Sequence, residues 1–430
     1  MGTKRNEYLD KVIGYVRNKE AKHFVARELQ HHLDQEKKYL KDSGLEDSAA
    51  EEKAILQMGS AERLGHEMNK LHRPKVDWIM IGLVLVISLI GILPILHMEE
   101  AYYKGDEFLV RKVFYLAVGA VISLSLMLFN YKHLQKLKWW IYCLTSLILI
   151  AVAIFPNQYI NGEGYFVILS FPIDSTVALT SLVLCWVIFL GGTRKKIWWT
   201  LPFLFVSISS LFIIPSITAA FVFVLTITVL LWFRYKENRK HMVLGYGIIT
   251  IIVGFMLSTA DLKPYQYERI SAFLHPDEYK RTSGYMYIRN QELLSRGGWF
   301  GNSGDAEAIA DAHSEYALTF ITYFYGWIAG GILIITGLFI MYRMIRSIKS
   351  IKDPFGRIII IGGVTLFATQ FLYNIGMILG FLPLTGMSLP FVSYGLNPTI
   401  QVSVVVGLFL SVYRRKNLVY VDAENVHVKN

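Results

Sequence analysis

The sequence predicts an all-α, polytopic membrane protein with about ten transmembrane helices, preceded by a small water-facing helical domain. Three observations lead to this prediction: the apolar composition, the long apolar segments after residue 76, and the charges between those segments. Hydrophobic residues make up 53% of the 430 residues and charged residues only 18%, whereas soluble domains carry about 25% charged residues. The composition excludes collagen-like and disordered chains, and two cysteines are too few for a disulfide-stabilised secreted domain.

The membrane part is predicted from segments that approach or exceed the roughly 20 apolar residues needed to cross a bilayer. Ten such segments follow Pro74, and the fifth and sixth are separated only by Pro215-Ser216. They are residues 77–97, 108–129, 139–155, 174–192, 197–214, 217–233, 242–259, 317–342, 358–381 and 398–413. The domains predicted from this pattern are 1–75, a membrane domain 76–416 and a tail 417–430.

The loop charges favour one orientation of these segments. Every second gap, beginning with 130–138, is rich in Lys and Arg, and the first gap is acidic. Because basic loops stay on the cytoplasmic side, both termini are predicted to be cytoplasmic and the protein multi-pass in the cytoplasmic membrane. The net charge of +10 is explained by these clusters, and no nucleic-acid partner is expected. No cleavable signal peptide is expected, since a long charged segment precedes the first apolar run.

Residues 1–75 are predicted to form the helical domain, because apolar residues spaced three or four apart make stripes at 9–16 and 25–33. Gly44 is expected to end a helix, and Ser48-Ala49-Ala50-Glu51 fits a capping box at the start of another. His31-His32 is interpreted as part of a solvated helix face, since no second ligand cluster matches it.

The segment 260–316 between the seventh and eighth apolar segments is a long outer loop rich in aromatic residues. Loops of this length are usually functional or disordered, and the aromatic content favours an ordered loop near the membrane surface. Its charged residues would suit a lipid-linked phosphate substrate with a sugar head group, although a solvated loop with weak ion pairs has the same composition. They are Arg269, Lys280, Arg281, Arg289, Arg296, Asp305, Glu307, Asp311, His313 and Glu315.

Three ionisable residues lie where apolar segments meet the outer surface. Glu315 precedes the eighth segment, where it could act as a general base or simply favour a helix N-terminus. Arg111 lies near the outer end of the second segment. It either has a function there or extends its charged end to the membrane interface. The adjacent Lys112 favours the second interpretation, since it is also expected to extend to the interface. Asp174 begins the fourth segment, and one outer polar cavity could collect Arg111 and Asp174.

The stretch 369–398 is unusual for a membrane segment because three prolines and four glycines interrupt it. Irregular backbone at membrane depth is tolerated only where it is buried in protein or lines a cavity. A cavity is therefore expected at the outer side of this stretch.

The same stretch resembles the SEDS family of cell-wall glycosyltransferases (shape, elongation, division and sporulation; the FtsW/RodA type). Residues 374–377 read Asn-Ile-Gly-Met, 380–386 Gly-Phe-Leu-Pro-Leu-Thr-Gly, and 389–395 Leu-Pro-Phe-Val-Ser-Tyr-Gly. These segments follow the family pattern almost residue by residue. The resemblance covers about residues 78–416, and residues 1–75 instead resemble the helical prefix of some Gram-positive permease-like proteins.

The resemblance implies a bacterial membrane enzyme that polymerises lipid II, an undecaprenyl-pyrophosphoryl disaccharide-pentapeptide. It implies that Glu315, in His313-Ser314-Glu315-Tyr316, is the catalytic base, and that Arg111 and Arg269 bind the pyrophosphate. A divalent cation such as Mg²⁺ or Mn²⁺ could assist them, and a class B penicillin-binding protein is the implied partner. The further substrate-binding residues that it implies are His313, Asp174, Ser393, Tyr394 and Asn374.

Several polar positions depart from the family pattern. The catalytic Asp is Glu315 here, the usual Gly-Ser-Ser is Leu396-Asn397-Pro398, and a Lys is replaced by Val177. The chain is therefore interpreted as a divergent paralogue. The alternatives to a lipid II polymerase are a catalytically weak or inactive membrane scaffold or regulator, and a transporter of lipid-linked precursors.

Overall fold

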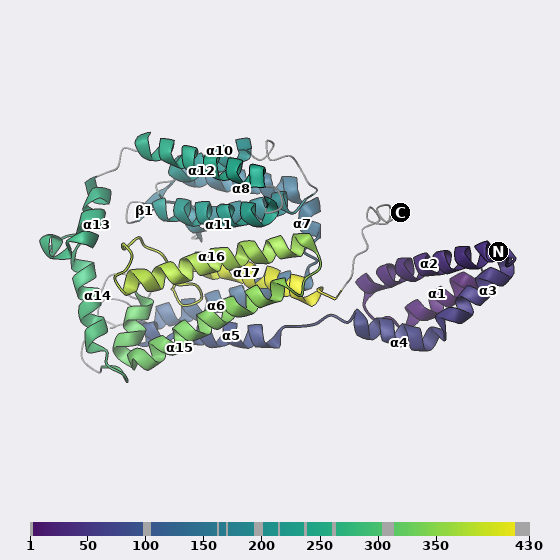
Figure 1. Cartoon of the computed structure of the whole chain (residues 1–430). Coiled ribbons are helices and arrows are strands. Elements are labelled where there is room, and N and C mark those ends of the chain that lie inside the picture. Colours follow the sequence, from purple (N-terminus) through teal and green to yellow (C-terminus); the bar gives the residue numbers. More distant parts are fainter. Residues whose placement is uncertain are drawn as a thin grey trace. The chain divides into compact units, whose positions relative to one another are not determined.

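The computed structural model describes residues 3–97, 105–160, 163–168, 171–192, 201–213, 216–235, 239–259, 264–302 and 314–417. The chain divides into two compact units, drawn in Figure 1. The larger contains residues 77–349 and 354–412, and the smaller contains the chain before residue 77 with 350–353 and the described residues after 412.

The smaller unit is built from four helices, α1 (Thr3–Tyr15), α2 (Lys19–Asp42), α3 (Asp47–Met58) and α4 (Ala61–Leu71). The two apolar stripes expected from the sequence do form its core, where Val12, Val25 and Leu29 are almost completely buried. α2 ends before Gly44, as expected, and Gly44 adopts a φ of 93°. Helix α1 packs closely on α4, because a Cβ added to Gly65 would lie 2.8 Å from the carbonyl oxygen of Val12.

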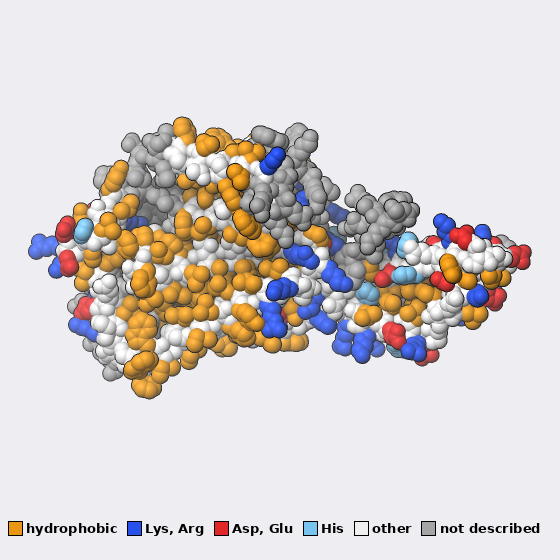
Figure 2. All heavy atoms as spheres, in the orientation of Figure 1, with side chains coloured by type: hydrophobic (Ala, Val, Ile, Leu, Met, Phe, Trp, Pro, Cys, Tyr) orange, Lys and Arg blue, Asp and Glu red, His pale blue; other side chains and the backbone are white. Residues whose placement is uncertain are grey.

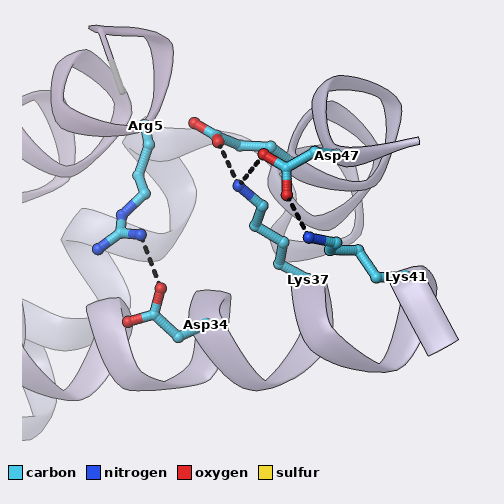
Figure 3. A network of polar contacts seen from close by, with 6 residues as sticks. Arg5, Asp34, Lys37, Lys41 and Asp47 are labelled. Atoms are coloured by element: carbon cyan, nitrogen blue, oxygen red, sulfur yellow. Dashed lines mark hydrogen bonds and ion pairs between the residues drawn. The ribbon is translucent and has the colours of Figure 1, made fainter. Parts of the chain in front are cut away.

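A network of ion pairs ties α2 to its neighbours at the surface of the smaller unit (Figure 3). Lys37 Nζ lies 2.9 Å from both Asp47 and Glu51, and Lys41 Nζ lies 2.8 Å from Asp47. The expected capping box is wrong. α3 already begins at Asp47 and its N-cap, Glu46, makes no side-chain capping bond, because Asp47 and Glu51 instead pair with the lysines of α2.

This network should make α3 sensitive to acid. The hydrogen bonds from Lys41 and Lys37 lower the pKa of Asp47 to about 2. A depressed pKa in the folded state gives stability above the ordinary pKa of an unfolded Asp, near 3.9, which is lost as pH falls towards 2. We expect amide hydrogen exchange in α3 to be faster in Asp47→Asn than in the parent at pH 6, and the two to converge near pH 2. A difference that persists at pH 2 would contradict this assignment.

The larger unit contains ten long or apolar helices and several short elements among its described residues. Its first half comprises α5 (Trp78–Ile90), η1 (Leu93–His97), α6 (Gly105–Leu128), α7 (His133–Lys136), α8 (Lys138–Ile154), β1 (Gln158–Ile160), β2 (Glu163–Ile168), β3 (Phe171–Ile173), α9 (Ser175–Leu190), α10 (Leu201–Ile213) and α11 (Ile217–Tyr235). Its second half comprises α12 (Arg239–Thr259), α13 (Pro264–Leu274), η3 (Pro276–Tyr279), α14 (Tyr285–Arg296), α15 (Ala317–Ile348), α16 (Pro354–Ile378) and α17 (Leu396–Arg414).

The all-α membrane fold is confirmed. Six helices or helix pairs in the described residues are long and apolar enough to cross a membrane, and four shorter apolar helices coincide with the other four expected segments. α10 ends at Ile213 and α11 begins at Ile217, so the expected break near Pro215 lies between two helices. Figure 2 shows hydrophobic side chains over α5, α15 and α16, with Lys and Arg gathered at the end where α5 begins and α15 ends.

The all-α expectation misses one local feature, a three-stranded antiparallel sheet between α8 and α9. Gln158 pairs with Tyr165, and Phe166 pairs with Ile173. The side chain of Asn157, just before β1, bonds to the backbone of β2: it accepts a hydrogen bond from Val167 N and donates one to Val167 O. These strands are too short to produce a clear alternation of polar and apolar residues in the sequence.

Helix α16 lies at the centre of the larger unit and packs against α9, α11 and α15. It buries residues on all sides, which is why its sequence has no polar face. α15 starts and α16 ends at the same end of the unit, near α13 and α14 (Figure 1). The charge pattern predicts that this end faces outward, and it is called the outer end below.

At the opposite end, a buried ion pair joins the start of α5 to the last turns of α15. Arg343 Nε lies 2.8 and 3.0 Å from the two carboxylate oxygens of Asp77, and Arg343 Nη2 lies 2.7 Å from Asp77 Oδ1. The Asp77 side chain is fully buried and also caps α5, because it accepts a hydrogen bond from Met80 N. This pair fixes the last turns of α15, a helix whose other end begins two residues after Glu315.

We expect Asp77→Asn to lower the stability of the protein by about 2 kcal/mol, because hydrogen bonds to a charged partner contribute about 1.5–3 kcal/mol. Asn can still cap α5, so the loss of stability reports the ion pair with Arg343 and not the cap. The apparent melting temperature in detergent should fall by about 5 °C. Arg346→Gln is the control, because the guanidinium of Arg346 contacts the exposed Tyr342 and should contribute little. Equal melting of Asp77→Asn and the parent would contradict the role of this pair.

Candidate functional site

The irregular stretch predicted from the sequence forms a non-helical segment, residues 379–395, between α16 and α17 at the outer end. Its backbone has positive φ angles at Gly380, Gly386, Phe391 and Gly395. Phe391 is the only non-glycine residue with a positive φ in the described chain. Such strain, about 1–3 kcal/mol, persists only where neighbouring groups fix the backbone, and it is common at functional sites.

Asn374, in the last turns of α16, connects this segment to Glu315. Its side-chain Nδ2 donates to Glu315 O at 3.0 Å and to Met387 O at 2.6 Å. Asn374 is fully buried, and its Oδ1 has no hydrogen-bond partner in the described part of the chain. The Asn374 amide therefore holds the backbone of the proposed base against the irregular segment.

Ser393 provides a second connection to the same backbone. Its Oγ accepts a hydrogen bond from Leu389 N and donates one to Ser314 O, both at 2.6 Å. Because Asn374 holds the carbonyl of Glu315 and Ser393 that of Ser314, two consecutive carbonyls are fixed just before α15. Sequence reasoning singled out both Asn374 and Ser393, and the structure brings them together with Glu315.

The Glu315 side chain is half-buried and lies beside Gly386. A Cβ added to Gly386 would stand 2.9 Å from Glu315 Oε1, closer than such atoms normally approach. Gly386 thus provides both the positive φ of 72° and the space that the carboxylate occupies. A favourable interaction of the Glu315 charge with the N-terminus of α15 is also compatible with this position, since α15 begins at Ala317.

The long outer loop is helical over much of its described length, and α14 is attached to the irregular segment. Asn290 Nδ2 donates to Ile378 O at 2.6 Å, and the Tyr287 hydroxyl accepts from Leu384 N at 2.7 Å. Burial raises the pKa of Tyr287, and the positive charge of Arg269 on α13 acts in the opposite direction. Arg269 therefore lies near Tyr287, on the loop side of the site.

Arg111 and Tyr394 form a separate group at the start of α17. Arg111 is 62% exposed and lies 3.7 Å from Glu107, within electrostatic range of the Tyr394 hydroxyl. The Tyr394 ring packs against Phe108 and Tyr115, with ring centroids 5.1 and 5.7 Å away. An exposed guanidinium in this position remains accessible to an anionic group.

Asp174 has a structural role that the sequence analysis did not identify. Its Oδ1 accepts hydrogen bonds from Thr176 N and Val177 N at 3.0 and 3.1 Å, so it is the N-cap of α9. The carboxylate is buried and also bonded to the Asn397 side chain at the start of α17. Asp174 and Asn397, the second of which departs from the family pattern, are therefore partners.

The expectation for Lys112 is wrong. Its side chain does not extend to the interface but is completely buried, and Nζ donates to the carbonyl oxygens of Val392 and Ser393. Arg111 and Lys112 are consecutive, so they lie about 100° apart around α6 and cannot point the same way. That geometry was available in the sequence, but it does not say which of the two side chains is buried.

Four of the loop residues singled out earlier, Asp305, Glu307, Asp311 and His313, lie outside the described residues. Within the described part of the chain, no group of three or more His, Cys, Asp or Glu side chains comes together. The proposed reaction therefore has no step that passes through a divalent cation.

Known proteins similar to this chain match it over the membrane domain. The family model FtsW/RodA/SpoVE, described as "Cell cycle protein", matches residues 74–418. The probable peptidoglycan glycosyltransferase FtsW of Trichlorobacter lovleyi is 24% identical, over 78% of this chain and 92% of its own length. The stage V sporulation protein E of Bacillus subtilis is 23% identical, over 79% of this chain and 97% of its own length.

Two solved structures have a similar fold. One is a chain from work on "Structural coordination of polymerization and crosslinking by a peptidoglycan synthase complex", with a TM-score of 0.65 at 23% identity. It covers 79% of this chain and 98% of that chain. The other is the rod shape determining protein RodA of Thermus thermophilus, with a TM-score of 0.56 at 19% identity, covering 79% of this chain and 97% of RodA.

Proposed function

The chain belongs to the FtsW/RodA/SpoVE family, and from this premise we propose that it is a membrane glycosyltransferase of peptidoglycan synthesis. Its substrate is lipid II, which it polymerises at the outer face of the bacterial cytoplasmic membrane, in wall synthesis linked to cell shape or division. Both chain termini then lie in the cytoplasm, in agreement with the basic loops.

One observation carries this proposal. The backbone at Ser314 and Glu315 is held at the outer end of the helices by bonds from Ser393 and Asn374, with the Glu315 carboxylate beside Gly386. A general base contributes to catalysis when it is fixed within hydrogen-bonding reach of the proton that it removes. The contacts of Glu315 fit this requirement better than those of an exposed surface acid.

In the proposed reaction, Glu315 accepts the proton of the acceptor sugar hydroxyl. The hydroxyl oxygen forms a bond to the anomeric carbon of the donor sugar, and the bond from that carbon to the pyrophosphate breaks with inversion. Undecaprenyl pyrophosphate leaves with the bonding electrons. Arg111 and Arg269 are the proposed partners of the developing negative charge, which guanidinium groups stabilise effectively.

A class B penicillin-binding protein is the proposed partner, because the glycan strand must be crosslinked after it is polymerised. The similar chain of a synthase complex, in which polymerization and crosslinking are coordinated, supports this pairing. The outer loop with α13 and α14 offers a surface at the same end as Glu315.

The test is polymerisation of fluorescent lipid II by the purified full-length protein in proteoliposomes. Reactions run with and without a class B penicillin-binding protein whose crosslinking activity is blocked. Glycan strands that a muramidase digests are the expected result. Lipid II binding without polymer, in both reactions, would overturn the enzyme assignment in favour of a scaffold, and lipid II movement across the bilayer without polymer would favour a transporter.

A further inference from the structure

Lys112 is a fully buried lysine in an apolar helix, and the proposed reaction has not used it. Its Nζ lies 2.9 Å from both Val392 O and Ser393 O, which come from the irregular segment 280 residues later in the chain. Ionisable side chains inside membrane helices are costly, and they are retained mainly where they serve a function. A terminal amine that donates to two backbone carbonyls acts on the shape of that backbone.

The two carbonyls belong to a hydrogen-bonded turn of the irregular segment, residues 389–393. Ser393 N donates to Leu389 O at 2.9 Å and Val392 N donates to the same oxygen at 3.2 Å, and Phe391 within the turn has a φ of 71°. From the other side, Gly91 at the end of α5 contacts the turn, since a Cβ there would lie 2.9 Å from Val392 Cα. Lys112 is the side chain that holds this strained backbone in place.

The turn leads directly to the proposed base. Ser393, whose carbonyl accepts from Lys112, uses its own hydroxyl to hold Ser314 O at 2.6 Å. Ser314 is adjacent to Glu315. The contacts therefore run from Lys112 to Ser393, from Ser393 to Ser314, and along the backbone to Glu315. A displacement of about 1 Å in a reacting group can lower a rate by about 10²-fold.

We propose that Lys112 is a positioning residue that fixes the 389–393 turn and, through Ser393, the backbone of Ser314 and Glu315. The catalytic consequence rests on the proposed function, whereas the structural consequence does not. A Gln side chain can also donate two hydrogen bonds from one nitrogen, although it is shorter than that of Lys.

The kinetic test compares Lys112→Met, Lys112→Gln, Ser393→Ala and the double variant Lys112→Met/Ser393→Ala. We expect kcat for lipid II polymerisation to fall at least 10-fold in Lys112→Met with KM changed less than about 3-fold, and to recover partly in Lys112→Gln. The double variant should be no slower than the slower single variant, because both act on one turn. Multiplied losses in the double variant, or a rise in KM alone, would overturn the proposal.

A second test does not depend on catalysis. In a Cys143→Ala/Cys185→Ala background, Ser314→Cys reports the order of the residue beside Glu315 through its rate of maleimide labelling. Lys112→Met should accelerate labelling at least 5-fold, and Lys138→Met, which changes a lysine beside Trp139 at the other end of the bundle, should not. If Lys112→Met accelerates labelling but the parent polymerises nothing, the proposed function fails and the positioning role stands. Unchanged labelling in Lys112→Met overturns the positioning role whatever the activity.

Discussion

Glu315→Gln is expected to lower the rate of lipid II polymerisation by about 10²–10⁴-fold, the usual contribution of a general base. Gln occupies nearly the same volume but cannot accept the acceptor hydroxyl proton. The bonds from Asn374 and Ser393 go to backbone carbonyls, so they survive the substitution. Lipid II binding, measured by fluorescence anisotropy, should therefore change by less than about 3-fold, which places the loss in kcat.

Two further variants make this result specific. Glu315→Asp retains a carboxylate on a shorter side chain. Because the backbone is held in place, this carboxylate lies farther from Gly386, and a rate between those of the parent and Glu315→Gln is expected. Glu278→Gln removes an exposed acid elsewhere in the outer loop and should match the parent. Polymerisation by Glu315→Gln at the parental rate would remove Glu315 from the mechanism and leave its position near the start of α15 as its only role.

The membrane fold was predictable from the sequence because its determinants are local and strong. Apolar segments of sufficient length fold as helices in lipid, where backbone groups must bond within the segment. Each expected segment coincides with a helix, including the pair separated near Pro215. The short sheet at residues 158–173 was not predictable, because strands of three to six residues leave too little periodicity.

The site was only partly predictable, for a different reason. Asn374, Ser393 and Glu315 were singled out through motif resemblance, but their mutual contacts depend on a fold that brings residues 59 and 79 positions apart into hydrogen-bonding distance. The roles of Asp174 and Lys112 were missed because each depends on its neighbours in space. A carboxylate before a helix can face solvent or cap the helix, and a lysine near a helix end can reach the interface or turn inward.

Gly386→Ala is expected to lower kcat for lipid II polymerisation by about 10²-fold, although it removes no functional group. The added methyl group would stand 2.9 Å from Glu315 Oε1, and the flexible carboxylate must move away from it. The φ of 72° adds about 1–2 kcal/mol of strain for a residue with a Cβ. A lower rate could therefore come from a displaced base or from a loosened segment, and the experiment must separate the two.

Gly380→Ala separates them, because Gly380 has a φ of 80° in the same segment. A Cβ there would lie 3.4 Å from the flexible amide of Gln291, an ordinary contact, and away from Glu315. The two variants should therefore lower the apparent melting temperature similarly, whereas only Gly386→Ala should lose about 10²-fold in kcat. Equal losses in kcat would mean that backbone strain, and not the space beside Glu315, explains the glycine at 386.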